Sequence, residues 1–174
     1  MSKAIFNNRV MPITGKMYRY ALSIVRDPET AHDVVQDCLA RIWEKRKMLP
    51  GINNVDSWVM RIVRNHCYDW VKVNRFNLRD HREPDSDGLT VPGSVEADQS
   101  VLLNDQLKWF DKVIGSLPQK QREIYHLREV EEMTYQEIAE VMSLTLGEVK
   151  INLHRTRGRI REMFKKIQEY GLAN

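Results

Sequence analysis

Apolar side chains recur every three or four residues along most of this chain, which is the spacing of one face of an α-helix. In the first half the pattern predicts helices over residues 13–25, from about 28 to about 47, and over 57–74. In the second half it predicts helices over residues 101–115, 119–130 and 135–142, and a longer one that begins after Thr145. The sequence therefore predicts an all-α fold.

Residues that start and stop helices support these limits. Asp27, Pro28 and Glu29 supply an N-cap oxygen, a proline at the first helical position and a carboxylate near the positive end of the helix dipole. Pro50 and Gly51 should end that helix, and Asp56 is expected to cap the next one.

The middle of the chain has a different composition. Residues 77–100 contain Pro84, Gly88, Pro92 and Gly93 and lack a sustained apolar period, which is typical of a linker. We therefore expect two small helical domains, residues 1–76 and 101–174, joined by a flexible linker over 77–100.

Charge divides the chain in the same way. The formal net charge of the 174 residues is only +3 at pH 7. Residues 1–76 are nevertheless net +6, whereas residues 77–100 are net −4. The small total thus hides an acidic linker between two helical segments.

Several classes of protein are excluded at this point. No apolar run reaches the roughly 18 to 20 residues that a membrane span requires, and no signal-peptide core follows Met1. Cys38 and Cys67 are far apart and lack metal-ligand spacing. Motifs for phosphate cradling or nucleophilic catalysis are missing. We expect a cytoplasmic protein that is not an enzyme and holds no cofactor or metal.

The helix predicted over 57–74 has two contrasting faces. Apolar residues and His66 form one stripe, which is expected to be core (Val59, Ile62, Val63, His66, Trp70, Val73). The opposite arc of roughly 100° carries cations, an amide and an aromatic ring (Arg61, Arg64, Asn65, Tyr68, Lys72, Arg75). Such side chains bind phosphates and stack on unpaired bases, although a solvated basic face is the simpler alternative.

A sharper pattern lies near the C-terminus. Thr134 with Glu137, and Thr145 with Glu148, both fit the capping box, and they begin helices eleven residues apart. That spacing predicts a helix-turn-helix, whose second helix can enter a DNA major groove. From Lys150 to Lys166 this second helix carries seven basic residues and one acidic residue, a density suited to phosphate neutralisation.

These segments together resemble the extracytoplasmic-function group of bacterial RNA polymerase sigma factors, which contain only regions two and four. Residues 31–43 and 56–65 resemble the group's AEDLVQExFLRxW and WL-RIA-N segments of region two. Residues 117–123, 134–139 and 147–157 resemble LPxxxRE, SYxEIA and GTVKSRLHRAR of region four. The order and spacing of the fragments match as well as their letters.

The resemblance implies a role for each surface. The core polymerase, through the clamp coiled coil of its largest subunit, would be met by Asp33, Gln36 and Asp37, with Trp43 supporting their helix. The −10 promoter element would be engaged by Arg61, Arg64, Asn65, Tyr68, Lys72 and Arg75, with an extruded base near Asn65. The −35 element would be contacted by Glu148, Lys150, Ile151, Asn152, Arg155 and Arg157, of which Arg157 would touch phosphate. A contact with the polymerase flap region and an anti-sigma partner are also implied.

Departures from the family pattern predict a distinct −35 preference. Glu148 replaces the usual Thr, and Ile151-Asn152 replace Ser-Arg. Glutamate can accept a hydrogen bond from cytosine, and isoleucine can contact a thymine methyl group.

Two other functions remain open at this stage. A stand-alone helix-turn-helix regulator would bind duplex DNA by itself, usually as a symmetric dimer. A module that sequesters a regulator would leave the face from Arg61 to Arg75 without a DNA role.

Overall fold

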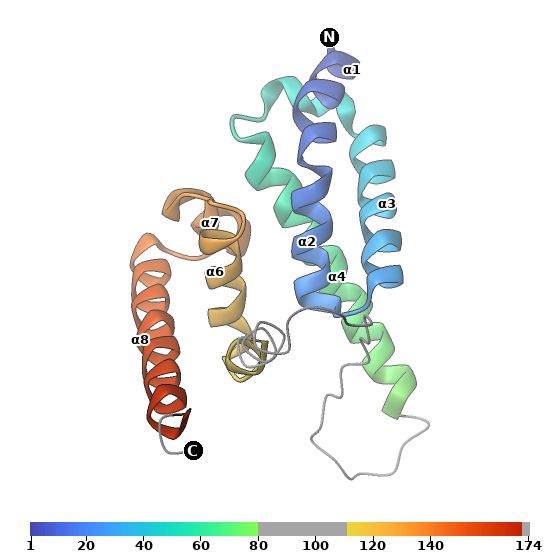
Figure 1. Cartoon of the computed structure of the whole chain (residues 1–174). Coiled ribbons are helices and arrows are strands. Elements are labelled where there is room, and N and C mark those ends of the chain that lie inside the picture. Colours follow the sequence, from blue (N-terminus) through green and yellow to red (C-terminus); the bar gives the residue numbers. More distant parts are fainter. Residues whose placement is uncertain (80–110, 172–174) are drawn as a thin grey trace, which may run out of the picture. The chain divides into compact units, whose positions relative to one another are not determined.

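The computed structural model describes residues 1–79 and 111–171, and every element in these ranges is helical (Figure 1). The predicted all-α fold is confirmed. The chain divides into two compact units: the first contains helices α1 to α4 together with residues 136–144, and the second contains α6 and α8. Each is described by itself.

The first unit is built on three long helices that pack against one another: α2 (Thr14–Val25), α3 (Pro28–Glu44) and α4 (Val55–Arg79). Shorter turns precede and connect them, namely α1 (Ser2–Ile5), a π-helical turn (Phe6–Val10) and 3-10 turns at Met11–Ile13 and Arg46–Gly51. The helices bury a common core that includes Met17, Tyr20, Val34, Cys38, Ile42, Val59 and Val63.

The start of α3 agrees with the sequence prediction. An Asp27 carboxylate oxygen accepts hydrogen bonds from the Thr30 amide at 2.8 Å and the Thr30 hydroxyl at 2.6 Å, and Pro28 occupies the first turn. These bonds hold the pKa of Asp27 below its usual value, because they stabilise the carboxylate.

The cap of α4 differs from the prediction. The helix begins at Val55, and the Asn54 side-chain oxygen accepts the Ser57 amide at 3.0 Å. Asp56 was therefore wrongly predicted as the cap. Asp56 lies inside the first turn, where its negative charge interacts favourably with the positive end of the helix dipole.

Helix α4 continues five residues beyond the predicted end at residue 74, so residues 77–79 are helical. Its last turns extend past α2 and α3 (Figure 1), which have 12 and 17 residues against its 25. Trp70 and Val73 are consequently 37% and 59% exposed, and their assignment to the core was wrong. Met60 and Cys67 are buried instead.

The second unit comprises residues 111–115, which are helical, α6 (Gln119–Glu129) and α8 (Leu146–Gly171). Helix α7 (Tyr135–Met142) lies between α6 and α8 along the chain. Val113, Leu117 and Ile160 form a core cluster against which Tyr125 and Met163 pack. The helix predicted over 101–115 falls mostly outside the described residues, as does most of the predicted linker.

Other expectations concern membranes and thiols. Among residues 1–79 and 111–171, no helix has the length and apolarity needed to cross a membrane. Cys38 and Cys67 are free and buried, and burial raises the pKa of the Cys38 thiol to about 12. Such a thiol is unreactive at neutral pH.

One stability prediction follows from Gly158, which lies in the interior of α8. A Cβ atom built there meets nothing within 4 Å. Glycine costs a helix interior about 0.5–1 kcal/mol relative to alanine, so Gly158→Ala should raise the free energy of unfolding by about that amount. Urea denaturation followed by circular dichroism measures this change. Gly147→Ala, at the start of α8, should gain less, and a loss of stability in Gly158→Ala would contradict the reasoning.

Candidate nucleic-acid and protein interfaces

The outer face of α3 carries the residues predicted to meet the polymerase. Asp33, Gln36 and Asp37 are all exposed, and their spacing puts them on one side of the helix. The opposite side is buried through Val34, Val35 and Cys38. The structure thus brings these three side chains onto one accessible surface.

Asp37 is also joined to α4. Its Oδ2 atom lies 3.2 Å from His66 Nε2, and the side chains are 66% and 13% exposed, respectively. Nδ1 of His66 is buried and has no hydrogen-bond partner in the described structure. His66 is therefore mostly buried, as expected, but it also links the α3 face to the helix that bears Asn65. The sequence did not reveal this contact, because 29 residues separate the two partners.

Trp43 lies at the C-terminal end of α3. Its ring meets Phe6 edge-to-face with centroids 5.0 Å apart, and the Arg46 guanidinium lies 4.4 Å from the ring centroid. These contacts attach the end of α3 to the N-terminal segment while leaving Trp43 37% exposed. Its geometry suits the supporting role that the resemblance implies.

The basic face of α4 is exposed at three of its positions between residues 61 and 72. Arg61, Asn65 and Lys72 are exposed, while Arg64 and Tyr68 are partly buried. The Arg64 guanidinium lies 4.7 Å from the Tyr68 ring centroid, a cation–π contact that holds both groups at the surface. The side chain of Arg75 lies outside the described residues.

A tight turn joins α7 to α8. Ser143 adopts the left-handed conformation with φ 54°, and the Leu144 amide donates to the Ala139 carbonyl at 2.9 Å. This is the Schellman arrangement that ends a helix. Thr145 then begins α8, so the helix-turn-helix predicted from the spacing is present.

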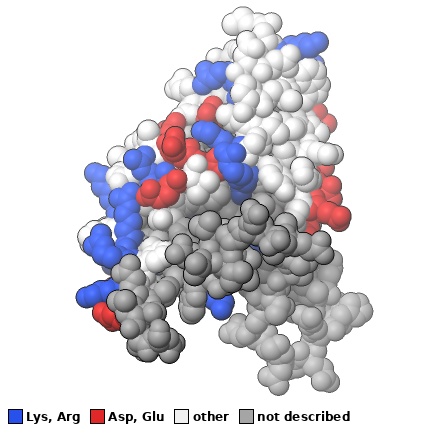
Figure 2. All heavy atoms as spheres, viewed as in Figure 1, with Lys and Arg blue, Asp and Glu red and all other residues white. Residues whose placement is uncertain are grey.

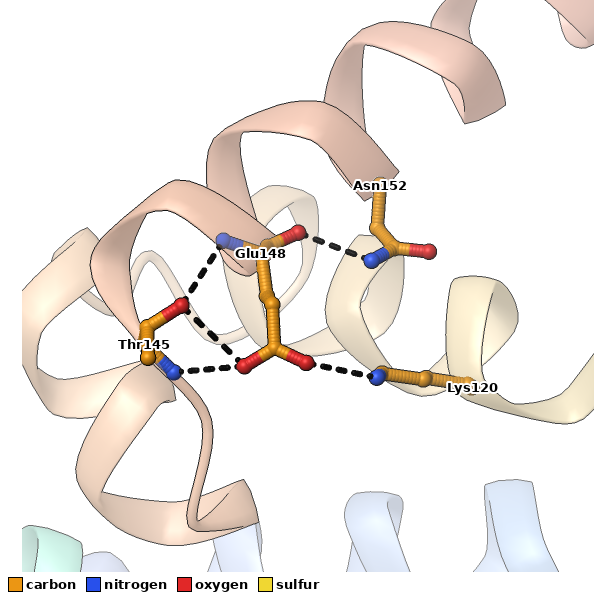
Figure 3. Close-up of polar contacts among 4 residues, drawn as sticks. All are labelled: Lys120, Thr145, Glu148 and Asn152. Carbon is orange, nitrogen blue, oxygen red and sulfur yellow. Dashed lines mark hydrogen bonds and ion pairs between the residues drawn. The ribbon is translucent and has the colours of Figure 1, made fainter.

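The second predicted capping box is confirmed (Figure 3). The Glu148 amide donates to Thr145 Oγ1 at 3.2 Å, and Glu148 Oε2 accepts from the Thr145 amide at 2.9 Å. The Thr145 hydroxyl also lies 3.1 Å from Oε2. The other carboxylate oxygen of Glu148, Oε1, is 3.4 Å from Lys120 Nζ on α6. The equivalent Thr134 box stays a prediction.

Glu148 is therefore engaged before any DNA arrives. Hydrogen bonds from the Thr145 amide and hydroxyl, and then from Lys120, lower the pKa of Glu148 below its usual value. The carboxylate is consequently charged at neutral pH. To accept a hydrogen bond from a cytosine it would have to share or exchange these partners.

Two further residues predicted for −35 contact are bound to the protein itself. Asn152 Nδ2 donates to the Glu148 carbonyl at 2.8 Å. Arg157 donates to Glu129 Oε1 from Nη2 at 2.6 Å and from Nε at 3.1 Å. The Asn152 side chain therefore lies along α8, and the Arg157 side chain lies against α6.

Lys150, Ile151 and Arg155, by contrast, have exposed side chains, and Ile151 is 52% exposed. His154 is also exposed, and because it follows Ile151 by three residues it lies on the same side of α8. Sequence reasoning treated His154 only as one of several scattered histidines, although its spacing from Ile151 could have placed it on this face. Lys120 was missed because its neighbour Glu148 comes 28 residues later.

Positive charge gathers over α8 in the space-filling view (Figure 2). The exposed cations on this helix include Lys150, Arg155, Arg159, Arg161, Lys165 and Lys166. Their opposite face is buried through Val149, Leu153 and Ile160. The helix is thus held by an apolar stripe and presents cations to its surroundings.

Comparison with known proteins identifies the family of both helical regions. Residues 13–76 match the family model for sigma-70 region 2, and residues 107–160 match that for sigma-70 region 4. These ranges contain α2 to most of α4, and α6 to the first half of α8.

Individual relatives agree. The chain is 30% identical over 142 residues to an RNA polymerase sigma-E factor of Streptomyces antibioticus, covering 80% of this chain and 73% of the relative. It is 26% identical to the sigma-E factor of Streptomyces coelicolor, covering 90% and 84%, respectively. It is 22% identical to the ECF RNA polymerase sigma factor SigW of Bacillus subtilis, covering 87% and 84%.

Two solved structures are similar. The sigma factor RpoE, crystallised with the anti-sigma factor NepR from Bartonella quintana, gives a TM-score of 0.71 at 25% identity, covering 92% of this chain and 96% of that one. CnrH, in complex with the cytosolic domain of CnrY, gives 0.63 at 19% identity, covering 94% and 90%. The chain belongs to the sigma-70 family of RNA polymerase sigma factors, in its extracytoplasmic-function group.

Proposed function

We propose that different helices of this alternative sigma factor bind core RNA polymerase and the two promoter elements. Residues 1–76 bind core RNA polymerase through α3 and the −10 element through α4. Residues 101–174 bind the −35 element through α8, and residues 77–100 tether the two domains. The protein acts in the cytoplasm by binding and strand capture, while nucleotide addition belongs to the polymerase.

The observation that carries this proposal is the separation of charge between neighbouring helices. The exposed face of α3 offers two carboxylates and an amide, whereas the exposed face of α4 offers Arg61, Asn65 and Lys72. A phosphate backbone is repelled by the first surface and attracted by the second. One small helical unit can therefore hold a protein on one side and a DNA strand on another.

Capture of a −10 base relies on the α4 face. Extruding a base from the duplex costs a few kcal/mol of stacking and pairing. The Asn65 amide offers both a donor and an acceptor to the edge of such a base. The Tyr68 ring offers a surface for stacking, and Arg61, Lys72 and Arg75 offer charge to the backbone. Arg64 keeps Tyr68 in place through the contact between their side chains.

Readout of the −35 element relies on the first turns of α8. Lys150, Ile151 and Arg155 project from the side opposite the buried stripe, as a recognition helix in a major groove requires. Glu148, Asn152 and Arg157 belong to the same interface, but each has an internal partner that DNA must displace or share. Arg157 contacts phosphate rather than a base edge.

Protein partners complete the proposal. The clamp coiled coil of the largest polymerase subunit receives the α3 face, and the flap region receives the second domain. RpoE was solved in complex with the anti-sigma factor NepR, and CnrH was solved in complex with the cytosolic domain of CnrY. We propose that an anti-sigma protein likewise binds the present chain and inhibits it.

The α3 assignment predicts loss of polymerase binding when its polar face is removed. The triple change Asp33→Ala, Gln36→Ala and Asp37→Ala should weaken core binding by at least ~10-fold, because each charge-assisted hydrogen bond contributes about 1.5–3 kcal/mol. A pulldown with core polymerase measures it. The matched control is Glu162→Ala with Glu169→Ala, which removes two exposed carboxylates from α8 and should leave core binding unchanged. Retained binding by the triple variant, with native circular dichroism, would refute the assignment.

The Asn65 assignment predicts a defect in strand separation. Asn65→Ala should reduce promoter opening by about 10-fold or more, since a well-placed pair of hydrogen bonds to a base contributes about 1–3 kcal/mol, while closed-complex binding changes less. Permanganate footprinting reports opening and a gel shift reports binding. Asn8→Ala, the same substitution at an exposed position outside α4, is the control. Equal losses in both measurements would argue against a base pocket.

The α8 assignment predicts altered −35 preference. Ile151→Ala should relax selection at one base pair by a few-fold, and Arg155→Ala should relax selection by about 10-fold where it contacts a base edge. A transcription assay on promoters with a randomised −35 element measures both. Lys166→Ala, an exposed cation further along α8, should weaken all promoters alike. Unchanged preference in both Ile151 and Arg155 variants would exclude direct readout by these residues.

A further inference from the structure

Lys120 is an exposed cation at the start of the helix-turn-helix region that no step of the proposed function uses. It is the second residue of α6, and its ammonium reaches the first turn of α8, where Nζ lies 3.4 Å from Glu148 Oε1 (Figure 3). Both side chains are 46% exposed. The pair therefore lies at the end of α8 that a −35 element approaches, if the proposed function holds.

Glu148 is a surprising residue at that place, because a carboxylate repels the DNA backbone. Thr145 keeps it charged and oriented through its amide and hydroxyl. A neutral glutamine would also complete the capping box, and the carboxylate adds a favourable interaction with the positive end of the α8 dipole. Its negative charge also acts on a neighbouring side chain.

The side chain on which the Glu148 charge acts is Lys120. An exposed ion pair contributes little to folding stability, so the Lys120–Glu148 contact is readily exchanged for another partner. An ammonium has three N–H donors, and a phosphate oxygen of duplex DNA is the anion that α8 brings closest. Glu148 and a phosphate then compete for the same cation.

We propose that Lys120 is a phosphate-binding residue of the −35 interface and that Glu148 restrains it. Glu148 holds the ammonium beside the first turn of α8 and partly neutralises it, which lowers affinity for every DNA sequence alike. The contacts of Ile151 and Arg155 with base edges then provide a larger share of the binding free energy. Because the restraint acts on every duplex equally, it lowers the overall affinity for DNA and leaves the affinity ratios between promoters unchanged.

The test uses holoenzyme assembled from core polymerase and the full chain, with duplexes that carry the −35 element or single base-pair changes in it. Affinity is measured across a range of salt concentrations. Lys120→Met should weaken binding severalfold and reduce the slope of log K against log salt by about one. Glu148→Gln, which preserves the capping box, should strengthen binding severalfold and equally for all duplexes. The gain should shrink when Glu148→Gln is combined with Lys120→Met.

Three results would overturn the inference. An unchanged affinity and salt slope in Lys120→Met would remove the phosphate contact. A change in preference at one base pair in Glu148→Gln would make Glu148 a base reader instead. Strictly additive effects of the two substitutions would show that Glu148 does not act through Lys120. Thermal unfolding of each variant identifies any that fails to fold.

Failure of this inference is distinguishable from failure of the proposed function. If Ile151→Ala and Arg155→Ala alter −35 binding while Lys120→Met does not, only the role of Lys120 is wrong. If none of the three changes binding, α8 is not the −35 surface and the proposed function itself fails.

Discussion

Burial of one stripe of α4 against α2 and α3 is the constraint on which the first unit depends. Val59, Val63 and Cys67 are fully buried in that contact, and each of the two valines contributes about 1.5–3 kcal/mol when it leaves water. Because a helix has a fixed 3.6-residue period, burying this stripe forces Arg61, Asn65 and Lys72 outward. Packing of the core therefore determines which α4 residues form the surface proposed for the −10 element.

The same packing couples the surfaces proposed for the polymerase and for the −10 element. Since α3 and α4 lie side by side, His66 reaches Asp37 at 3.2 Å, and an atom of the proposed polymerase surface is held by the helix of the proposed −10 surface. In the second unit, too, one side chain has two structural roles. Thr145 and Glu148 begin α8, and the same carboxylate contacts Lys120 on α6. Helix capping and surface charge are thus set by one side chain.

Local signals in the sequence predicted most elements of the fold. Asp27 and Pro28 located the start of α3, and the spacing of Thr145 and Glu148 located the start of α8, because a cap acts within three residues of itself. Errors arose where the outcome depends on distant neighbours. Trp70 and Val73 fit the apolar period of α4 but are exposed, because α2 and α3 are too short to cover them. Asn54 rather than Asp56 caps α4, because the helix begins two residues earlier than predicted.

By itself, the sequence determined the helical class, the helix-turn-helix and the family, since all three depend on periodicity and short motifs. The exposed face with Asn65 followed from periodicity, whereas Asp33 and Ile151 were implied by the family resemblance. Only the tertiary structure decided which of them already have partners. Asp37 pairs with His66, Arg157 with Glu129, and Glu148 with Lys120. The two members of each pair are 28 or 29 residues apart, so only the packing of helices brings them within hydrogen-bonding distance.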